Sequence, residues 1–118
     1  MGKYIKRLYL SAPYSHPNKL VRQYRVKMAN QKAAELMERG YRVFSPLSHS
    51  HPISKYCQVD PCDHDFWLRQ DLWILPYCDI FYIYTLKGWS RSEGVKREFW
   101  EAQTHNLEIM FSFNERLT

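Results

Sequence analysis

A single carboxylate carries the clearest chemical potential in this sequence. Glu98 follows Gly94 by four residues and precedes Ala102 by four, so all three share one stripe of a predicted helix. The two small neighbours leave the Glu98 side chain in a notch, and its closeness to the helix N-terminus favours the ionised form. An ionised, accessible carboxylate in a cleft can act as a nucleophile. The alternative is an exposed surface glutamate paired with Arg91 or Lys96.

The start of the same helix has the residue types of an anion site. Ser90, Ser92 and Gly94 lie where free backbone N–H groups and the helix dipole attract negative charge. The segment is neither a Walker loop nor a GxGxxG turn. Serines at helix starts are commonly simple caps, so this feature alone leaves phosphate binding open.

Potential metal ligands are concentrated between residues 49 and 64. They are His49, His51, Cys57, Cys62 and His64. Zinc accepts both residue types, but this spacing fits no common zinc module. We therefore expect no metal and no cofactor.

Four strands are predicted from short apolar runs bounded by turn residues. They lie at residues 4–11, 42–45, 79–86 and 108–113. The segment 46–62, rich in Ser, His and Pro, is predicted to be a long irregular loop.

Three helices are predicted between the strands. The first is capped by Asn18 and ends near Gly40. Its apolar positions are Leu20, Tyr24, Met28, Ala29, Ala33, Leu36 and Met37. The second begins at Asp63 or Asp65, and the third begins at a capping box formed by Ser90 and Glu93 and ends near Asn106.

The alternation of strands and helices predicts an α/β fold. We expect a flavodoxin/Rossmann-like three-layer sandwich, with a parallel sheet of about four strands in the order 2-1-3-4 and helices on both faces. Ligands bind such sheets at the carboxyl ends of the strands, at the switch point. Here that point lies between the loops 11–18 and 85–92.

Length and composition limit the class of protein. The 118 residues, 45% apolar and 25% charged, predict one globular domain spanning 1–118 and argue against disorder. Three cysteines, an odd number without a CxxC pair, favour a reducing cytoplasm over a disulfide scaffold. The sequence contains neither an apolar run of membrane-spanning length nor a signal-peptide core, so we expect no membrane association.

The net charge of +5 is unevenly distributed. Residues 1–59 carry eleven Lys/Arg and two Glu, whereas residues 60–118 carry six Lys/Arg and ten Asp/Glu. A basic first half favours anionic partners such as phosphate groups, nucleic acid or an acidic face of another subunit. A solvated basic helix is the simpler alternative.

Three motifs together resemble the nucleoside 2-deoxyribosyltransferase family, including its deoxynucleoside 5′-monophosphate N-glycosidases. They are YLSAP at 9–13, QDL at 70–72 followed by Leu75 and Asp79, and SxGVxxE at 92–98. The chain departs from the monophosphate enzymes at Ala12 and Pro13, where they have a Gly-Ser pair. Its loop before Ser92 is also longer. Which base is removed, and whether a 5′-phosphate is required, therefore stays open.

The resemblance implies an enzyme that cleaves an N-glycosidic bond by hydrolysis or base transfer. Glu98 would attack C1′ of a 2-deoxyribosyl group through an oxocarbenium-like transition state and form a covalent glycosyl-enzyme. Asp71 would protonate the departing base, which requires a raised pKa. Tyr9 would position Glu98 by a hydrogen bond. Asp79, at the start of a strand, is interpreted as structural.

The resemblance also implies a set of substrate-binding residues. Ser92 and Gly94 would hold the 5′-hydroxyl or phosphate, and Trp89 could stack on the base or simply anchor its loop. The other candidates follow the first and second strands and are Ser11, Ala12, Pro13, Ser48, His49 and His51. The substrate would be a deoxynucleoside or deoxynucleotide, and relatives suggest a homo-oligomer, a dimer or larger.

Two other functional classes remain open. Basic residues on the first helix and an aromatic content of 16% suit a nucleic-acid-binding protein. Against that class, most aromatic residues occupy apolar strand and helix positions, and no recognised binding module is present. A non-catalytic nucleotide sensor on the same fold is the second alternative.

Overall fold

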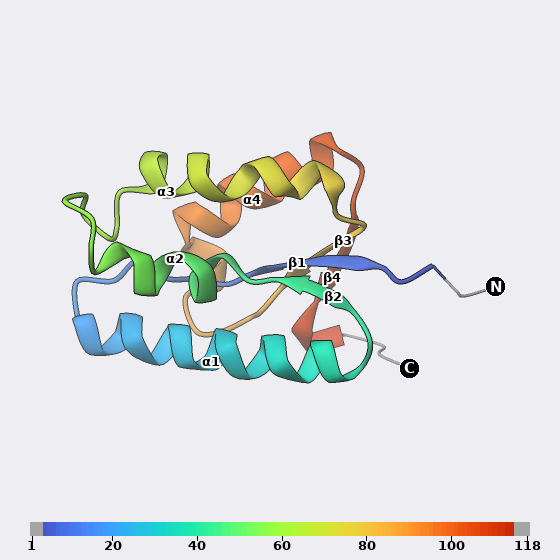
Figure 1. The fold of residues 1–118 in the computed structure, drawn as a ribbon, viewed down its shortest axis with the longest axis horizontal. Coiled ribbons are helices and arrows are strands. Elements are labelled where there is room, and N and C mark those ends of the chain that lie inside the picture. Colours follow the sequence, from blue (N-terminus) through green and yellow to red (C-terminus); the bar gives the residue numbers. More distant parts are fainter. Residues whose placement is uncertain (1–3, 115–118) are drawn as a thin grey trace.

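The sheet of this protein is parallel and four-stranded, with helices on both faces (Figure 1). The computed structural model describes residues 4–114. The strands are β1 (Arg7–Ser11), β2 (Arg42–Phe44), β3 (Ile80–Ile83) and β4 (Glu108–Phe111). Their order is β2-β1-β3-β4, and every neighbouring pair is parallel. The predicted α/β fold and the strand order 2-1-3-4 are therefore confirmed, although the strands are shorter than predicted.

The two faces of the sheet bury two separate apolar clusters. On β1, Leu8 and Leu10 face α1 (Lys19–Glu38), while Tyr9 lies in the cluster that includes Val95 of α4 (Glu93–Thr104). Side chains alternate along a strand, so Ser11 shares the face of Tyr9. The carboxyl end of β1 therefore directs two hydroxyl groups toward α4.

The first helix has the predicted ends, and Ala29, Ala33 and Leu36 of its predicted apolar face are buried. Asn18 caps α1 by accepting a hydrogen bond from the Leu20 backbone N–H at 2.8 Å, and Gly40 has the positive φ of +102° that ends the helix. The buried residues of α1 are Val26, Ala29, Ala33 and Leu36. Leu20, Tyr24 and Met37, predicted to be apolar contacts, are exposed. Small side chains occupy most of the buried line, which lets α1 approach the sheet closely.

The segment predicted to be an irregular loop contains a helix instead. Residues Pro46–Ser54 form α2, which lies beside α1 at the end of the sheet where β1 leads into α1 (Figure 1). Pro46 occupies the first turn, where a missing N–H costs nothing. The buried residues Pro46, Ser50 and Ser54 recur every four positions. The helical period escaped the sequence analysis because this face is not apolar.

The remaining helices begin close to their predicted positions. Asp63 caps α3 (His64–Asp71), which continues into the tighter η1 (Leu72–Tyr77). The capping box predicted at Ser90 and Glu93 is wrong by two residues, because Ser90 lies in the short turn η2 (Trp89–Arg91) and Ser92 caps α4. None of the helices in the described part of the chain is long and apolar enough to cross a membrane.

Arg25 of α1 ties together the two loops at the switch point. Its guanidinium donates to the carbonyl oxygens of Tyr14 at 3.4 Å and Ser15 at 3.1 Å in the loop after β1. It also donates to the carbonyl oxygen of Lys87 at 3.1 Å in the loop after β3. One side chain therefore fixes the distance between the loops that flank the site.

Replacing Arg25 by methionine should therefore destabilise the fold. Arg25→Met keeps the length of the side chain but removes all three hydrogen bonds, so the free energy of unfolding should fall by about 2 kcal/mol in urea titrations. Lys27→Met, at an exposed position of the same helix, is the matched control and should change it by less than about 0.5 kcal/mol. Equal losses in the two variants would show that the loops do not depend on Arg25.

Candidate active site

The Glu98 carboxylate is buried and has a hydrogen-bond donor on each oxygen. Glu98 is only 5% exposed. The Tyr9 hydroxyl donates to Oε2 at 2.5 Å, and the Ser11 hydroxyl donates to Oε1 at 2.8 Å. Both donors come from β1 and are fully buried, so water cannot replace Glu98 as their hydrogen-bond acceptor. The orientation of the carboxylate is therefore fixed from the side of the sheet.

Burial controls the proton affinity of Glu98. Desolvation raises the pKa of Glu98 to about 7, although the hydrogen bonds from Tyr9 and Ser11 lower it, and the charge of Asp71 raises it further. We predicted an ionised side chain from the helix dipole, but a pKa of about 7 divides the carboxyl group between its two forms near neutral pH. The dipole favours the anion only modestly, and removal from water outweighs it.

A second buried carboxyl group is supplied by the last residue of α3. Asp71 is 5% exposed and accepts the Ser50 hydroxyl at 2.9 Å on Oδ1 and 3.1 Å on Oδ2. His49 Nδ1 lies 3.8 Å from Oδ1. Burial raises the pKa of Asp71 to about 6, while Ser50 and His49 lower it. The raised pKa expected of this residue is therefore present.

Glu98 and Asp71 line one cavity. It is open to solvent and leaves a volume of about 80 Å³ for the centres of water-sized molecules. Its walls come from the loop after β1, from α2, from residues 61–71 and from the start of α4. Among the predicted substrate-binding residues, the cavity is lined by Ala12, His51, Ser92 and Gly94. The cavity thus lies at the carboxyl end of β1, near the predicted switch point.

The other predicted contacts lie behind the cavity wall or away from it. Ser11 contacts Glu98 rather than the cavity, and Pro13 is buried within its loop. Ser48 hydrogen-bonds to Ser45 and Asn30. His49 is not part of the lining and lies beside Asp71 instead.

Trp89 is the clearest correction among the predicted contacts. Its ring packs against the rings of Phe111 and Phe113, with centroids 5.7 and 6.3 Å apart. Trp89 does not line the cavity, so it anchors its loop and is not placed to stack on a base there. The reason is that the end of β4, which lies beside this loop, supplies the aromatic side chains that Trp89 packs against.

Several lining residues were missed by the sequence analysis. Ser50 went unnoticed because its helix was read as a loop. His64 also lines the cavity, and its Nδ1 lies 3.7 Å from the point where a Cβ of Gly94 would stand. The Tyr14 hydroxyl and His51 Nδ1, both in the lining, are 2.9 Å apart. The contact between Tyr14 and His51 could not be predicted from the sequence, because it depends on the path of the loop after β1.

The histidines and cysteines of residues 49–64 do not gather around one point. Among residues 4–114, no three His, Cys, Asp or Glu side chains are grouped as a metal site would require. Cys57, Cys62 and Cys78 are free thiols.

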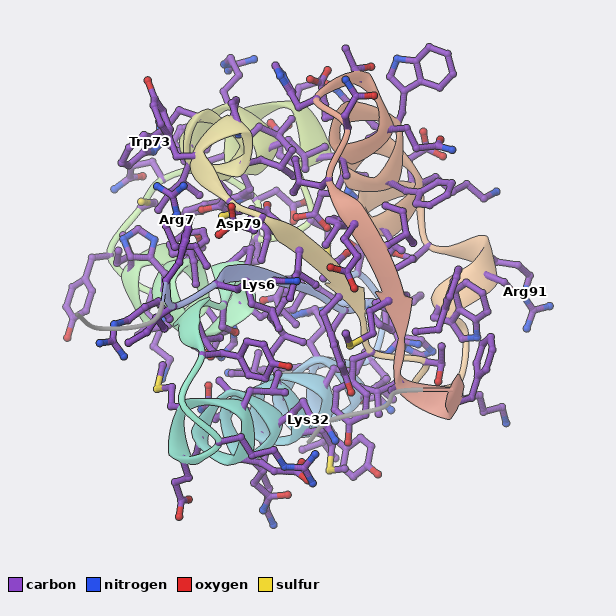
Figure 2. All side chains as sticks on the ribbon, turned by 90° about the vertical axis from the view of Figure 1, so that its right-hand side faces the viewer. Lys6, Arg7, Lys32, Trp73, Asp79 and Arg91 are labelled. Atoms are coloured by element: carbon purple, nitrogen blue, oxygen red, sulfur yellow. The ribbon has the colours of Figure 1, made fainter. Side chains whose placement is uncertain are left out.

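Asp79 lies at the opposite end of the sheet, as predicted. Its carboxylate accepts the Tyr4 hydroxyl at 2.7 Å and the Arg7 backbone N–H at 2.8 Å. Figure 2 views this end and shows Asp79 beside Arg7. The predicted position of Asp79 is confirmed, and its hydrogen bonds connect the start of β3 to the start of β1.

Comparison with known proteins identifies a family. Residues 6–113 match the family model described as a domain of unknown function, DUF1937. The match spans most of the chain, so the chain belongs to this family. A search of curated proteins returned no match.

The raised pKa of Glu98 predicts that this residue costs stability. The unfolded chain binds the Glu98 proton with a pKa of 4.5 and the folded chain with a pKa of about 7. The folded state therefore holds the proton more tightly, and stability falls as pH rises through that window. Relative to the parent protein, Glu98→Gln should gain on the order of 3 kcal/mol between pH 4 and pH 8 in urea titrations.

Glu101→Gln, one turn from Glu98 and half-buried, is the matched control and should show no such gain. A difference between Glu98→Gln and the parent that stays constant from pH 4 to pH 8 would contradict the argument.

Proposed function

We propose that this member of the DUF1937 family cleaves the N-glycosidic bond of a 2′-deoxynucleoside or its 5′-monophosphate through a covalent glycosyl–Glu98 intermediate, resolved by water or by another base. One observation carries the proposal. Glu98 is held by Tyr9 and Ser11 and faces a cavity that Asp71 also lines. No cation in the described chain is bonded to Glu98, so the carboxylate is available to a ligand.

The two carboxyl groups suit the two halves of a retaining mechanism. Glu98 attacks C1′ as the bond to the base lengthens, and Asp71 protonates the departing base. In the second half, Asp71 accepts a proton from water or from an acceptor base, which then attacks C1′ and releases Glu98. Tyr9 and Ser11 keep the Glu98 oxygens in one place through both steps.

The walls of the cavity suit the rest of such a substrate. Ser92 and Gly94 line the cavity at the start of α4, about 9 Å and about 6 Å of helix axis before Glu98. In the proposal they hold the 5′ substituent at the helix N-terminus while Glu98 faces C1′. His51, with Tyr14, and Ala12 lie on the side of the cavity formed by α2 and the loop after β1, where they could contact the base or the sugar.

The assembly and location of the protein are part of the same proposal. Among the described residues, eleven large apolar side chains are exposed, which suits a homo-oligomer. The three free thiols suit the reducing cytoplasm.

Release of base from deoxynucleosides and their monophosphates tests the proposed function. The protein should release free base from at least one member of such a panel, and Glu98→Gln should lose at least about 1000-fold in kcat because the nucleophile is gone. Glu101→Gln is the matched control and should keep the parent activity. Base exchange with an added acceptor would identify a transferase. Nucleotide binding without turnover by the intact protein would contradict the proposal and identify a sensor.

The pH dependence of kcat/KM should be bell-shaped. The mechanism needs one proton on the Glu98–Asp71 pair, and the two groups titrate near pH 7 and pH 6. Activity should therefore peak between about pH 6 and pH 7 and fall on the acid side, where both groups are protonated. Activity should also fall on the alkaline side, where neither carboxyl group is protonated. A rate that rises steadily to pH 9 would contradict a shared proton.

A further inference from the structure

Helix α2 presents two buried serines to the cavity, and their hydroxyl groups have different partners. Ser50 and Ser54 are one turn apart, are each 9% exposed and both line the cavity. The Ser54 hydroxyl donates to the carbonyl oxygen of His51, within its own helix, at 2.6 Å. The Ser50 hydroxyl instead leaves the helix and bonds to Asp71. Only one of the two serines therefore acts on the candidate acid.

The hydrogen-bond inventory fixes the direction of the Ser50–Asp71 bond. Ser50 has one hydroxyl proton, and the Asp71 oxygens are the only acceptors it contacts within residues 4–114. If a protonated Asp71 donated to Ser50 instead, the buried Ser50 proton would lose its acceptor. Ser50 therefore donates whether Asp71 is charged or neutral. Ser50 lies nearer Oδ1 than Oδ2, so the carboxyl proton of neutral Asp71 then sits on Oδ2 and points away from Ser50.

We propose that Ser50 is the positioning residue of Asp71: its hydroxyl keeps Oδ1 as an acceptor, so that Oδ2 presents the acid proton to the base in the cavity. This assignment rests on the proposed function. Ser50 touches neither the sugar nor the reacting atoms in this mechanism and acts only through Asp71. It adds to the site a residue that no motif in the sequence points to.

Other charged groups that face Asp71 must be separated from the effect of Ser50. They are His49 from α2, Glu98 from α4 and Tyr9 from β1. None of them is altered by a change at Ser50 or Ser54. Comparison of two serine variants on the same helix therefore isolates the hydroxyl that bonds to Asp71.

The test compares Ser50→Ala with Ser54→Ala on two leaving groups. With an ordinary base, Ser50→Ala should lower kcat about tenfold with little change in KM, because the acid proton is no longer directed. The optimum should move to higher pH, because the Asp71 anion loses its donor. An N7-methylated purine carries its own positive charge and needs no acid, so its release should be nearly unaffected. Ser54→Ala should keep the parent protein's ratio of the two rates, and Ser50→Thr should restore that ratio.

A titration that does not depend on turnover separates this proposal from the proposed function. Carboxyl NMR of the Glu98→Gln protein reports the pKa of Asp71 directly, and that pKa should rise with Ser50→Ala but not with Ser54→Ala. If no deoxynucleoside is cleaved, this titration still decides whether Ser50 acts on Asp71. Equal pKa values of Asp71 in the two serine variants would overturn the assignment. So would an equal loss of rate by Ser50→Ala on ordinary and N7-methylated bases.

Discussion

The burial of the Glu98 carboxyl group between α4 and the end of β1 is the constraint on which the site depends. A carboxyl group removed from water needs donors, and here both come from one strand. They can do so because Tyr9 and Ser11 are two residues apart and therefore share a face. The helix must in turn lie close to the sheet, which the fully buried Ala102 allows one turn beyond Glu98. Fold and site are thus one packing arrangement.

The sequence predicts the features of this arrangement that follow from periodicity. Alternating strands and helices gave the sheet order, and the spacing of Gly94, Glu98 and Ala102 indicated a carboxylate in a notch. Features that depend on the path of polar segments were not predictable. Helix α2 buries serines rather than leucines, so it carries no apolar period. Arg25 bonds to backbone carbonyl groups, which leave no trace in the sequence.

The similar pKa values of Glu98 and Asp71 have a consequence for the proposed reaction. In the free protein Glu98 has the higher pKa, the reverse of what a nucleophile and an acid require. The reaction itself corrects this order. Positive charge on an oxocarbenium-like sugar stabilises the Glu98 anion beside it, and electron density arriving on the base draws the proton from Asp71. Because the two pKa values differ by little, the charge of the bound substrate is enough to determine which carboxyl group carries the proton.

The two sides of the cavity are held by different forces. The side that carries Glu98 belongs to an apolar cluster with Tyr9, Val95 and Ala102. Helix α2 contributes no residue to either apolar cluster, and polar pairs fasten it to its neighbours. These pairs are Ser48 with Asn30, Ser50 with Asp71, and His51 with Tyr14. Substitutions on α2 other than at Ser50 can therefore alter the cavity without disturbing the apolar cluster around Glu98, so the proposed function leaves the choice of substrate free to vary on this side of the cavity.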